Sequence, residues 1–161
     1  MSIVKYGEAV LRNKTKPVVD FDDRLRKTIE QMKAKMFEAN GVGLAATQVG
    51  LDLALFVAKL GEEVYAFVNP VIVPLSMEKN KDEEGCLSVP GVWVEVERFE
   101  RIRLRAQYPD GKEVDLELEG YHARIVQHEV DHLNGVLIID RIPPKKRREI
   151  SEQLDEIARN N

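Results

Sequence analysis

The sequence predicts an α+β fold in which short, mainly antiparallel strands pack around a central helix, with an N-terminal helix and a C-terminal helix beside them. Residues 21–39 repeat apolar side chains at helical spacing, whereas several segments between residues 53 and 119 alternate with a period of two. Residues 121–134 are helical in pattern and carry an H-E-x-x-H motif. We expect one domain, residues 1–161, because no segment is typical of a linker or a repeat.

Residues 21–39 are expected to form the N-terminal helix. Apolar side chains recur there at spacings of 4, 3 and 4 residues, which places them on one helix face. Asp20 or Asp22 can cap the start of the helix, and the pair Asn40-Gly41 is typical of its end. The apolar stripe, which we expect to face the core, consists of Leu25, Ile29, Met32 and Met36.

The middle of the chain is expected to form a set of strands. Val92, Val94 and Val96 alternate with a tryptophan and two glutamates, which suits an antiparallel strand with one face in water. Asp110-Gly111 is a strong signal for a hairpin turn between the last two strands. The expected strands are residues 53–58, 64–73, 92–98, 101–107 and 112–119.

Two helices are expected in the last third of the chain. The first, residues 121–134, ends at Asn134-Gly135, and its many apolar side chains indicate that it is buried. The second follows Pro143-Pro144 and spans about residues 144–158. Its narrow apolar stripe consists of Ile150, Leu154 and Ile157.

Composition narrows the class of protein. Hydrophobic residues make up 43% of the sequence and charged residues 32%, as in a water-soluble globular protein. The net charge of −4 gives no general attraction to nucleic acid, so we expect no sequence-specific nucleic-acid binding. No stretch approaches the roughly 18 apolar residues of a membrane span, and the first residues lack a signal peptide's apolar run. A single cysteine, Cys86, excludes an internal disulfide, so we expect a cytoplasmic protein without membrane contact.

The pentad His128-Glu129-Val130-Asp131-His132 is the most informative chemical feature. A spacing of four residues puts both imidazoles on one face of a helix, where they can bind one metal ion. The carboxylate of Glu129 then lies beside the metal and can take a proton from water. A solvated helix face with two chance histidines is the alternative, but the sequence has only 3 histidines and 2 of them stand in this register.

A third ligand is needed, since a catalytic site usually has three protein ligands and one open position. The extended protease pattern H-E-x-x-H-x-x-G-x-x-H fails, because Ile138 stands where its third histidine would be. Glu149 or Glu152 would complete a zinc endopeptidase, although an exposed helix face explains both better. Cys86, expected in a loop between strands, is the other candidate, because a thiolate binds zinc or ferrous iron well. In a third hypothesis, a binding module, protein ligands saturate the metal and Glu129 has no role.

Three motifs occur in a specific order along the chain. They are Gly-Val-Gly-Leu-Ala-Ala-Thr-Gln at residues 41–48, Glu-Gly-Cys-Leu-Ser at residues 84–88, and Gln-His-Glu-Val-Asp-His at residues 127–132. With this set the chain resembles the peptide deformylase family, from about residue 3 to about residue 143. Residues 7–12 look like a variant of the family's opening segment, with Glu-Ala where Asp-Pro is common.

The resemblance implies an enzyme that removes the formyl group from the N-terminal formyl-methionine of newly made proteins. Glu129 would be the general base and then the acid, while the Gln48 side chain and the Leu87 backbone N–H would hold the oxyanion. The cofactor would be one divalent metal ion, Fe²⁺ as the working ion, with Zn²⁺, Ni²⁺ or Co²⁺ able to substitute. By this resemblance the metal ligands are Cys86, His128 and His132.

The resemblance also implies how formyl-methionyl peptides and nascent chains bind. The peptide would add as a strand along backbone groups of Val42, Gly43 and Gly85, a mode that tolerates many sequences. Glycine at two of these positions allows the substrate backbone to come close.

The methionine side chain needs an apolar pocket. Tyr121, Arg124 and Ile125 precede His128 by 7, 4 and 3 residues and share its helix face, so we expect them to line the pocket with Val42. The methylenes of Arg124 would form a wall while its guanidinium reaches water. The alternative for Arg124 is a bridge to a surface glutamate.

Two further expectations concern charged groups. The resemblance suggests that Glu84 pairs with an arginine on the following strand, for which Arg98 is the candidate, and that this pair steadies the Cys86 segment. An ordinary surface charge is the alternative for Arg98. The basic run at residues 145–148 is expected to be a solvated face, with contact to the anionic ribosome as the minority interpretation. His122, the remaining histidine, is expected to be structural or exposed.

Overall fold

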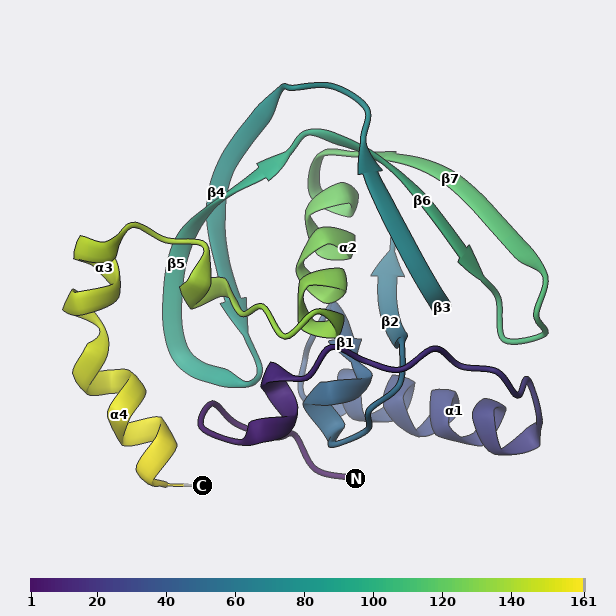
Figure 1. Ribbon diagram of the computed structural model, residues 1–161, viewed down its shortest axis with the longest axis horizontal. Coiled ribbons are helices and arrows are strands. Elements are labelled where there is room, and N and C mark those ends of the chain that lie inside the picture. Colours follow the sequence, from purple (N-terminus) through teal and green to yellow (C-terminus); the bar gives the residue numbers. More distant parts are fainter. Residues whose placement is uncertain (161) are drawn as a thin grey trace.

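The computed structural model describes residues 1–160 and shows helix α2 (Gly120–Leu133) running through the middle of the molecule (Figure 1). A five-stranded sheet lies on one side of α2 and a two-stranded sheet on the other. Neighbouring strands in both sheets are antiparallel, so the predicted fold class is confirmed.

The larger sheet has the strand order β1-β2-β3-β6-β7. Its strands are β1 (Gly43–Ala45), β2 (Leu55–Leu60), β3 (Glu63–Pro74), β6 (Arg101–Gln107) and β7 (Glu113–Glu119). The smaller sheet is formed by β4 (Lys79–Cys86) and β5 (Val89–Phe99). Short 3₁₀ helices occur at Ala9–Arg12, Ala46–Val49 and Ile138–Asp140.

Strand β2 is buried on both faces, which explains its nearly continuous apolar sequence. Phe56 and Ala58 pack in the cluster that contains the apolar side chains of α2. Leu55 and Val57 point the other way, into the cluster formed with helix α1 (Asp23–Glu38). Because strand side chains alternate between faces, one strand joins the two cores and fixes α2 on one face and α1 on the other.

Helix α1 follows the sequence prediction closely. The side chain of Asp22 accepts a hydrogen bond from the backbone N–H of Leu25 at 3.0 Å, so Asp22 rather than Asp20 is the cap. At the other end Asn40, with φ of 57°, takes the left-handed conformation. All four residues of the predicted stripe are buried: Leu25, Ile29, Met32 and Met36.

The turn between β6 and β7 confirms the hairpin signal. Gly111 has φ of 89°, a conformation that glycine adopts without steric cost. The Asp110 side chain accepts a hydrogen bond from the backbone N–H of Lys112 at 3.0 Å and closes the turn.

The structure corrects the expectation that Cys86 lies in a loop. Cys86 is the last residue of β4, a strand that the sequence pattern did not predict. Its residues from Lys79 to Glu83 are polar and have no apolar alternation, so pairing with β5, from Lys79–Phe99 to Gly85–Trp93, defines the strand. Strand β1 was missed as well, because it is only three residues long.

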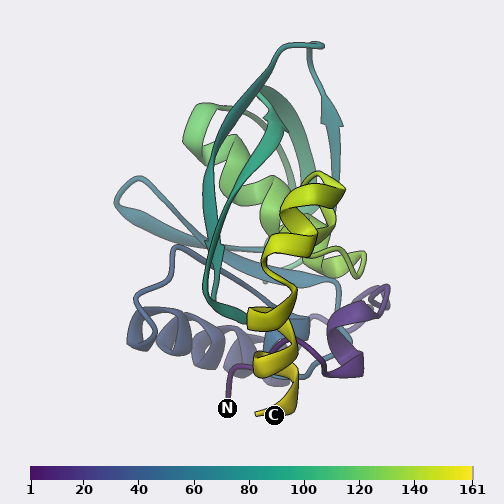
Figure 2. The same ribbon diagram turned by 90° about the vertical axis from the view of Figure 1, so that its left-hand side faces the viewer.

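The C-terminal helix is also different from the prediction. It is divided at Ile150 into α3 (Pro144–Glu149) and α4 (Ser151–Arg159). The predicted stripe is correct, since Ile150 and Leu154 are buried against the valines of β5 and Ile157 is partly buried there (Figure 2). None of the helices within residues 1–160 combines the length and apolar character needed to cross a membrane.

Candidate active site

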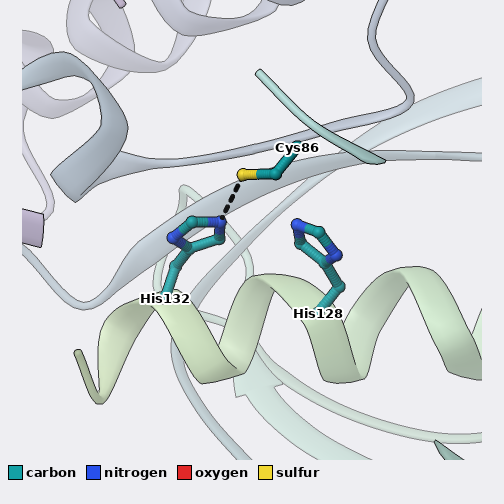
Figure 3. Close-up of side chains that lie close together, drawn as sticks. All are labelled: Cys86, His128 and His132. Carbon is teal, nitrogen blue, oxygen red and sulfur yellow. Dashed lines mark hydrogen bonds between the residues drawn. The ribbon is translucent and has the colours of Figure 1, made fainter. Parts of the chain in front are cut away.

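The side chains of Cys86, His128 and His132 converge at the end of β4, where it faces helix α2 (Figure 3). One potential ligand atom from each residue lies within 4.8 Å of the other two. The Cys86 Sγ is 3.3 Å from the His132 Nε2. The predicted ligand set is therefore brought together from two elements that are far apart in the sequence.

A contact outside this cluster orients His128. His128 donates its Nδ1–H to the Glu84 Oε1 at 2.8 Å, which leaves Nε2 available for a metal ion. The Nδ1 of His132 and the Oε1 of Glu129 are buried and have no hydrogen-bond partner among the described residues. Buried polar atoms without partners are uncommon, so the free Oε1 of Glu129 indicates that the site accommodates an additional group, whereas His132 Nδ1 lies on the side of the ring away from Cys86 (Figure 3).

The donor set suits a divalent metal. One thiolate and two imidazoles match the preferences of zinc and ferrous iron, and three protein ligands leave a position open for water or substrate. The position of these three donors therefore supports a metal cofactor. The residues present fit such an ion, because their potential ligand atoms already lie within 4.8 Å of one another.

The two histidines have opposite protonation tendencies in the protein without metal. Burial lowers the pKa of His132 well below its usual value, and the positive charge of His128 lowers it further. Burial opposes the charge on His128 too, but the Glu129 carboxylate and hydrogen bonds with Cys86 and Glu84 raise the pKa of His128 well above its usual value. Because a metal binds neutral imidazole, metal binding must displace the proton from His128.

Glu129 is buried next to the cluster. A Cβ atom at Gly43 would lie 2.4 Å from the Glu129 Oε2, so only glycine at residue 43 allows the carboxylate to occupy this place. Burial raises the pKa of Glu129 to about 7, although the charge of His128 opposes this shift. A nearby metal cation would lower that pKa, which favours a carboxylate able to accept a proton.

Gln48 is held with its amide pointing at the cluster. Its Oε1 accepts a hydrogen bond from the backbone N–H of Ala45 at 3.0 Å. Its Nε2 donates to the Cys86 Sγ at 3.6 Å and to the Ser88 Oγ at 3.2 Å. Since sulfur is a weak acceptor, one N–H of this amide is available to a stronger acceptor in the site.

The predicted ion pair between Glu84 and Arg98 is confirmed. Arg98 donates from Nε and Nη2 to the two Glu84 oxygens at 3.0 and 2.9 Å. Its Nη1 donates to Asp131 at 2.5 Å, and Asp131 also accepts two hydrogen bonds from Arg141. Burial alone would raise the pKa of Glu84, but the hydrogen bonds from Arg98 and His128 outweigh it and hold the pKa well below its usual value.

The structure corrects the expectation for Arg124. Its guanidinium does not reach water, because the residue is only 4% exposed and donates to Glu84, Asn80 and the Val96 carbonyl. The glutamate that it contacts is buried, so the alternative of a surface bridge is wrong as well. The sequence pattern of the helix gave no sign that Arg124 would be buried.

A cavity of about 580 Å³ opens beside the cluster. Val92 and Trp93, which we did not predict to be at the site, line this cavity. A Cβ at Gly85 would lie 2.7 Å from the Trp93 ring. The described cavity wall contains every residue that we expected to bind substrate: Val42, Gly43, Gly85, Tyr121, Arg124 and Ile125. It also contains Gln48, Cys86, Leu87, His128 and Glu129. His132 is not among the residues that line the cavity.

Comparison with known proteins independently supports the family resemblance that the three sequence motifs indicated. The family model for polypeptide deformylase matches residues 1–148. The chain belongs to the polypeptide deformylase family. The peptide deformylase of Thermotoga sp. (strain RQ2) is 51% identical over 154 residues, which cover 96% of this chain and 94% of that relative.

Solved deformylase structures have the same fold. The crystal structure of the peptide deformylase from Thermus thermophilus has a TM-score of 0.92 and 44% identity, covering 98% of this chain and 97% of that one. The Plasmodium falciparum peptide deformylase in complex with inhibitor has a TM-score of 0.92 and 37% identity, covering 98% and 99%. Deformylases remove N-terminal formyl groups, so the zinc endopeptidase alternative is not favoured.

The buried carboxylate of Glu84 should be essential for stability. Replacing Glu84 by Ala leaves two buried guanidinium groups without their shared anion, and breaking such a pair costs about 3–5 kcal/mol. Urea unfolding of the metal-free protein measures this change separately from metal binding. Glu83→Ala is the matched control, because Glu83 is exposed on the same strand and its loss should cost within about 0.5 kcal/mol. Equal unfolding free energies for the two variants would contradict the prediction.

Proposed function

We propose that this chain acts as a single catalytic domain that removes the formyl group from the N-terminal formyl-methionine of newly made proteins. The observation that carries the proposal is the convergence of Cys86, His128 and His132 beside the buried carboxylate of Glu129. A saturated metal site in a binding module would not require a buried carboxylate and an open cavity at the same place.

The proposed metal ligands are the Cys86 thiolate and the imidazoles of His128 and His132. A divalent cation bound there would make water acidic enough, with a pKa of about 7, to supply a nucleophile near neutral pH. We propose Fe²⁺ as the working ion, with Zn²⁺, Ni²⁺ or Co²⁺ as substitutes. The thiolate ligand would make the ion a weaker Lewis acid than a third imidazole would.

Glu129 is proposed as the proton carrier. Its side chain follows a ligand directly in the sequence and its unpartnered Oε1 is buried, so a water in the site can use it as an acceptor. The same carboxyl group then returns the proton to the departing amine. Burial raises the proton affinity of this carboxyl group, and a bound cation would lower it again.

Gln48 and Leu87 are proposed to stabilise the oxyanion that forms when the formyl carbon is attacked. The Gln48 amide is fixed by Ala45 and Ser88, so its N–H is preorganised rather than recruited. Leu87 follows Cys86 directly and lines the same cavity, which supports its backbone N–H as the second donor. Each donor of this kind typically contributes about 10²–10³ in turnover.

The cavity is proposed to bind the formylated peptide. Strand β1, which contains Gly43, is an edge strand of the larger sheet, so a peptide can pair with it. Val42 and Gly85 would take part in the same pairing. The methionine side chain would contact the proposed pocket residues, which are Val42, Tyr121, Ile125 and the methylenes of Arg124.

A substrate that leaves the ribosome suggests where the protein acts. We propose a cytoplasmic location and a contact between the basic run of α3 and ribosomal RNA. Lys145 and Arg148 are exposed, and Lys146 has a weak partner in Glu149 at 3.8 Å.

The role of Glu129 can be tested by replacement with Ala. Metal content should remain near one ion per chain, while turnover of a formyl-Met tripeptide should fall by about 10²–10⁴ because no proton acceptor remains. Atomic absorption and a formate assay on the same sample give both numbers. Glu152→Ala is the control: full metal content and activity are expected, whereas loss of metal in that variant would support the endopeptidase ligand set instead.

The identity of the metal can be tested by preparation under different conditions. Protein purified in air should be less active than protein loaded with Fe²⁺ under reducing conditions, because both the thiolate and ferrous iron can be oxidised. Reloading the air-exposed sample with Fe²⁺ and a reductant should restore activity. If both preparations turn over the tripeptide equally well, iron is not the working metal.

Ribosome contact can be tested by co-sedimentation. The chain should pellet with ribosomes at low salt and be released at high salt, since the proposed contact is electrostatic. A variant with Lys145, Lys146 and Arg148 replaced by Gln should lose this binding while keeping its activity on the tripeptide. Binding that is absent, or insensitive to salt, would count against the contact.

A further inference from the structure

Both terminal nitrogens of the Arg124 guanidinium donate to acceptors inside the protein. Nη1 donates to the Glu84 Oε2 at 2.5 Å and to the Val96 carbonyl at 2.9 Å. Nη2 donates to the carbonyl oxygen of Asn80 at 3.0 Å and also to the Asn80 side chain. Burying a charged group is costly, so four acceptor atoms from three residues, arranged around a planar fork, indicate a specific role for this arginine.

The carboxylate of Glu84 links Arg124 to His128. Oε1 accepts from His128 Nδ1 and Arg98 Nη2, and Oε2 accepts from Arg124 Nη1 and Arg98 Nε. Both oxygens therefore have two donors, and a rotation of the carboxylate that frees one donor disturbs the other three. The orientation of the His128 ring depends on this single position of the carboxylate.

Arg124 and His128 come from the same helix, whereas Glu84 and Arg98 come from the smaller sheet. The two residues on α2 are four apart and lie on one face, one turn from each other. They bond different oxygens of Glu84, so the carboxylate is held against α2 at two points rather than one. Without the Arg124 bond, His128 would be the only direct contact of the Glu84 carboxylate with α2, although the pair of Arg98 with Asp131 would still join the smaller sheet to the helix.

We infer that Arg124 is a positioning residue for the metal site: through Glu84 it holds the His128 ring with Nδ1–H donated and Nε2 directed at Cys86 and His132. This inference rests on the proposed metal site. The role belongs to the guanidinium, whereas the residue as a whole also lines the cavity. The two contributions can be separated by chemistry, because methionine has a similar apolar stem without the charge.

The experiment measures metal binding rather than turnover. Co²⁺ affinity is determined by competition with a chelator, and the d–d absorption bands of bound Co²⁺ report the ligand geometry. Arg124→Met should bind Co²⁺ about 10–100-fold more weakly than the wild type and show altered bands, because a ligand's hydrogen-bonded support is lost. Glu84 keeps both bonds from Arg98 in this variant, which favours a folded protein.

Two further variants define the result. Arg124→Lys should recover part of the affinity, because its ammonium can donate to Glu84 but does not reproduce the fork that reaches Val96 and Asn80. Arg103→Met is the matched control, because Arg103 pairs with Asp115 on the exposed surface of the larger sheet and should bind Co²⁺ like the wild type.

The outcomes separate this inference from the proposed function. If the wild type binds Co²⁺ and Arg124→Met binds it equally well with unchanged bands, the inference is wrong and the proposed function stands. If the wild type binds no Co²⁺, the proposed metal site itself fails. If Arg124→Met does not fold, the Lys variant decides: wild-type affinity and bands in Arg124→Lys would overturn the role of the fork.

Discussion

The structure around the site depends on one buried carboxylate. Glu84 is 6% exposed and accepts four hydrogen bonds, two from Arg98 and one each from Arg124 and His128. Its desolvation is offset only because every acceptor position is used, and a partly satisfied site would be costly. As a result, the strand that ends in Cys86 is held against the helix that carries both histidines.

Helix α2 transmits this constraint to the rest of the fold. One side of the helix packs on the larger sheet through Ala123, Val126 and Val130, while another side presents His128 and its neighbours to the smaller sheet. The helix therefore cannot move toward one sheet without leaving the other. The proposed metal site is built from α2 and β4, so both sets of contacts hold its residues in place. A metal site requires such fixed positions for its ligands.

Glycines complete the site by letting atoms approach where side chains would not fit. Gly43 admits the Glu129 carboxylate and Gly85 admits the Trp93 ring, so two residues of the proposed peptide-binding edge also shape the buried side. Glycine in these two motifs is thus required for packing, in addition to its proposed role in binding the peptide. The position of the Glu129 carboxylate and that of the Trp93 ring therefore depend on glycine at residues 43 and 85.

The sequence by itself determined the local features, and only the tertiary structure decided those that depend on partners far away in the chain. Periodicity identified α1, α2 and most strands, because each has an apolar face of its own, and the pentad identified two candidate ligands, because helical spacing brings them together. The chemistry of a thiolate made Cys86 one candidate for the third ligand, and the resemblance of the three ordered motifs to one family favoured it over the glutamates and suggested the pair of Glu84 with Arg98. Strand β4 is polar and exists through pairing with β5, and the division of the last helix at Ile150 accompanies packing against that same strand. The burial of Arg124 could not be predicted either, because Asn80 and Glu84 lie at least 40 residues away in the sequence and only the fold brings them to its guanidinium.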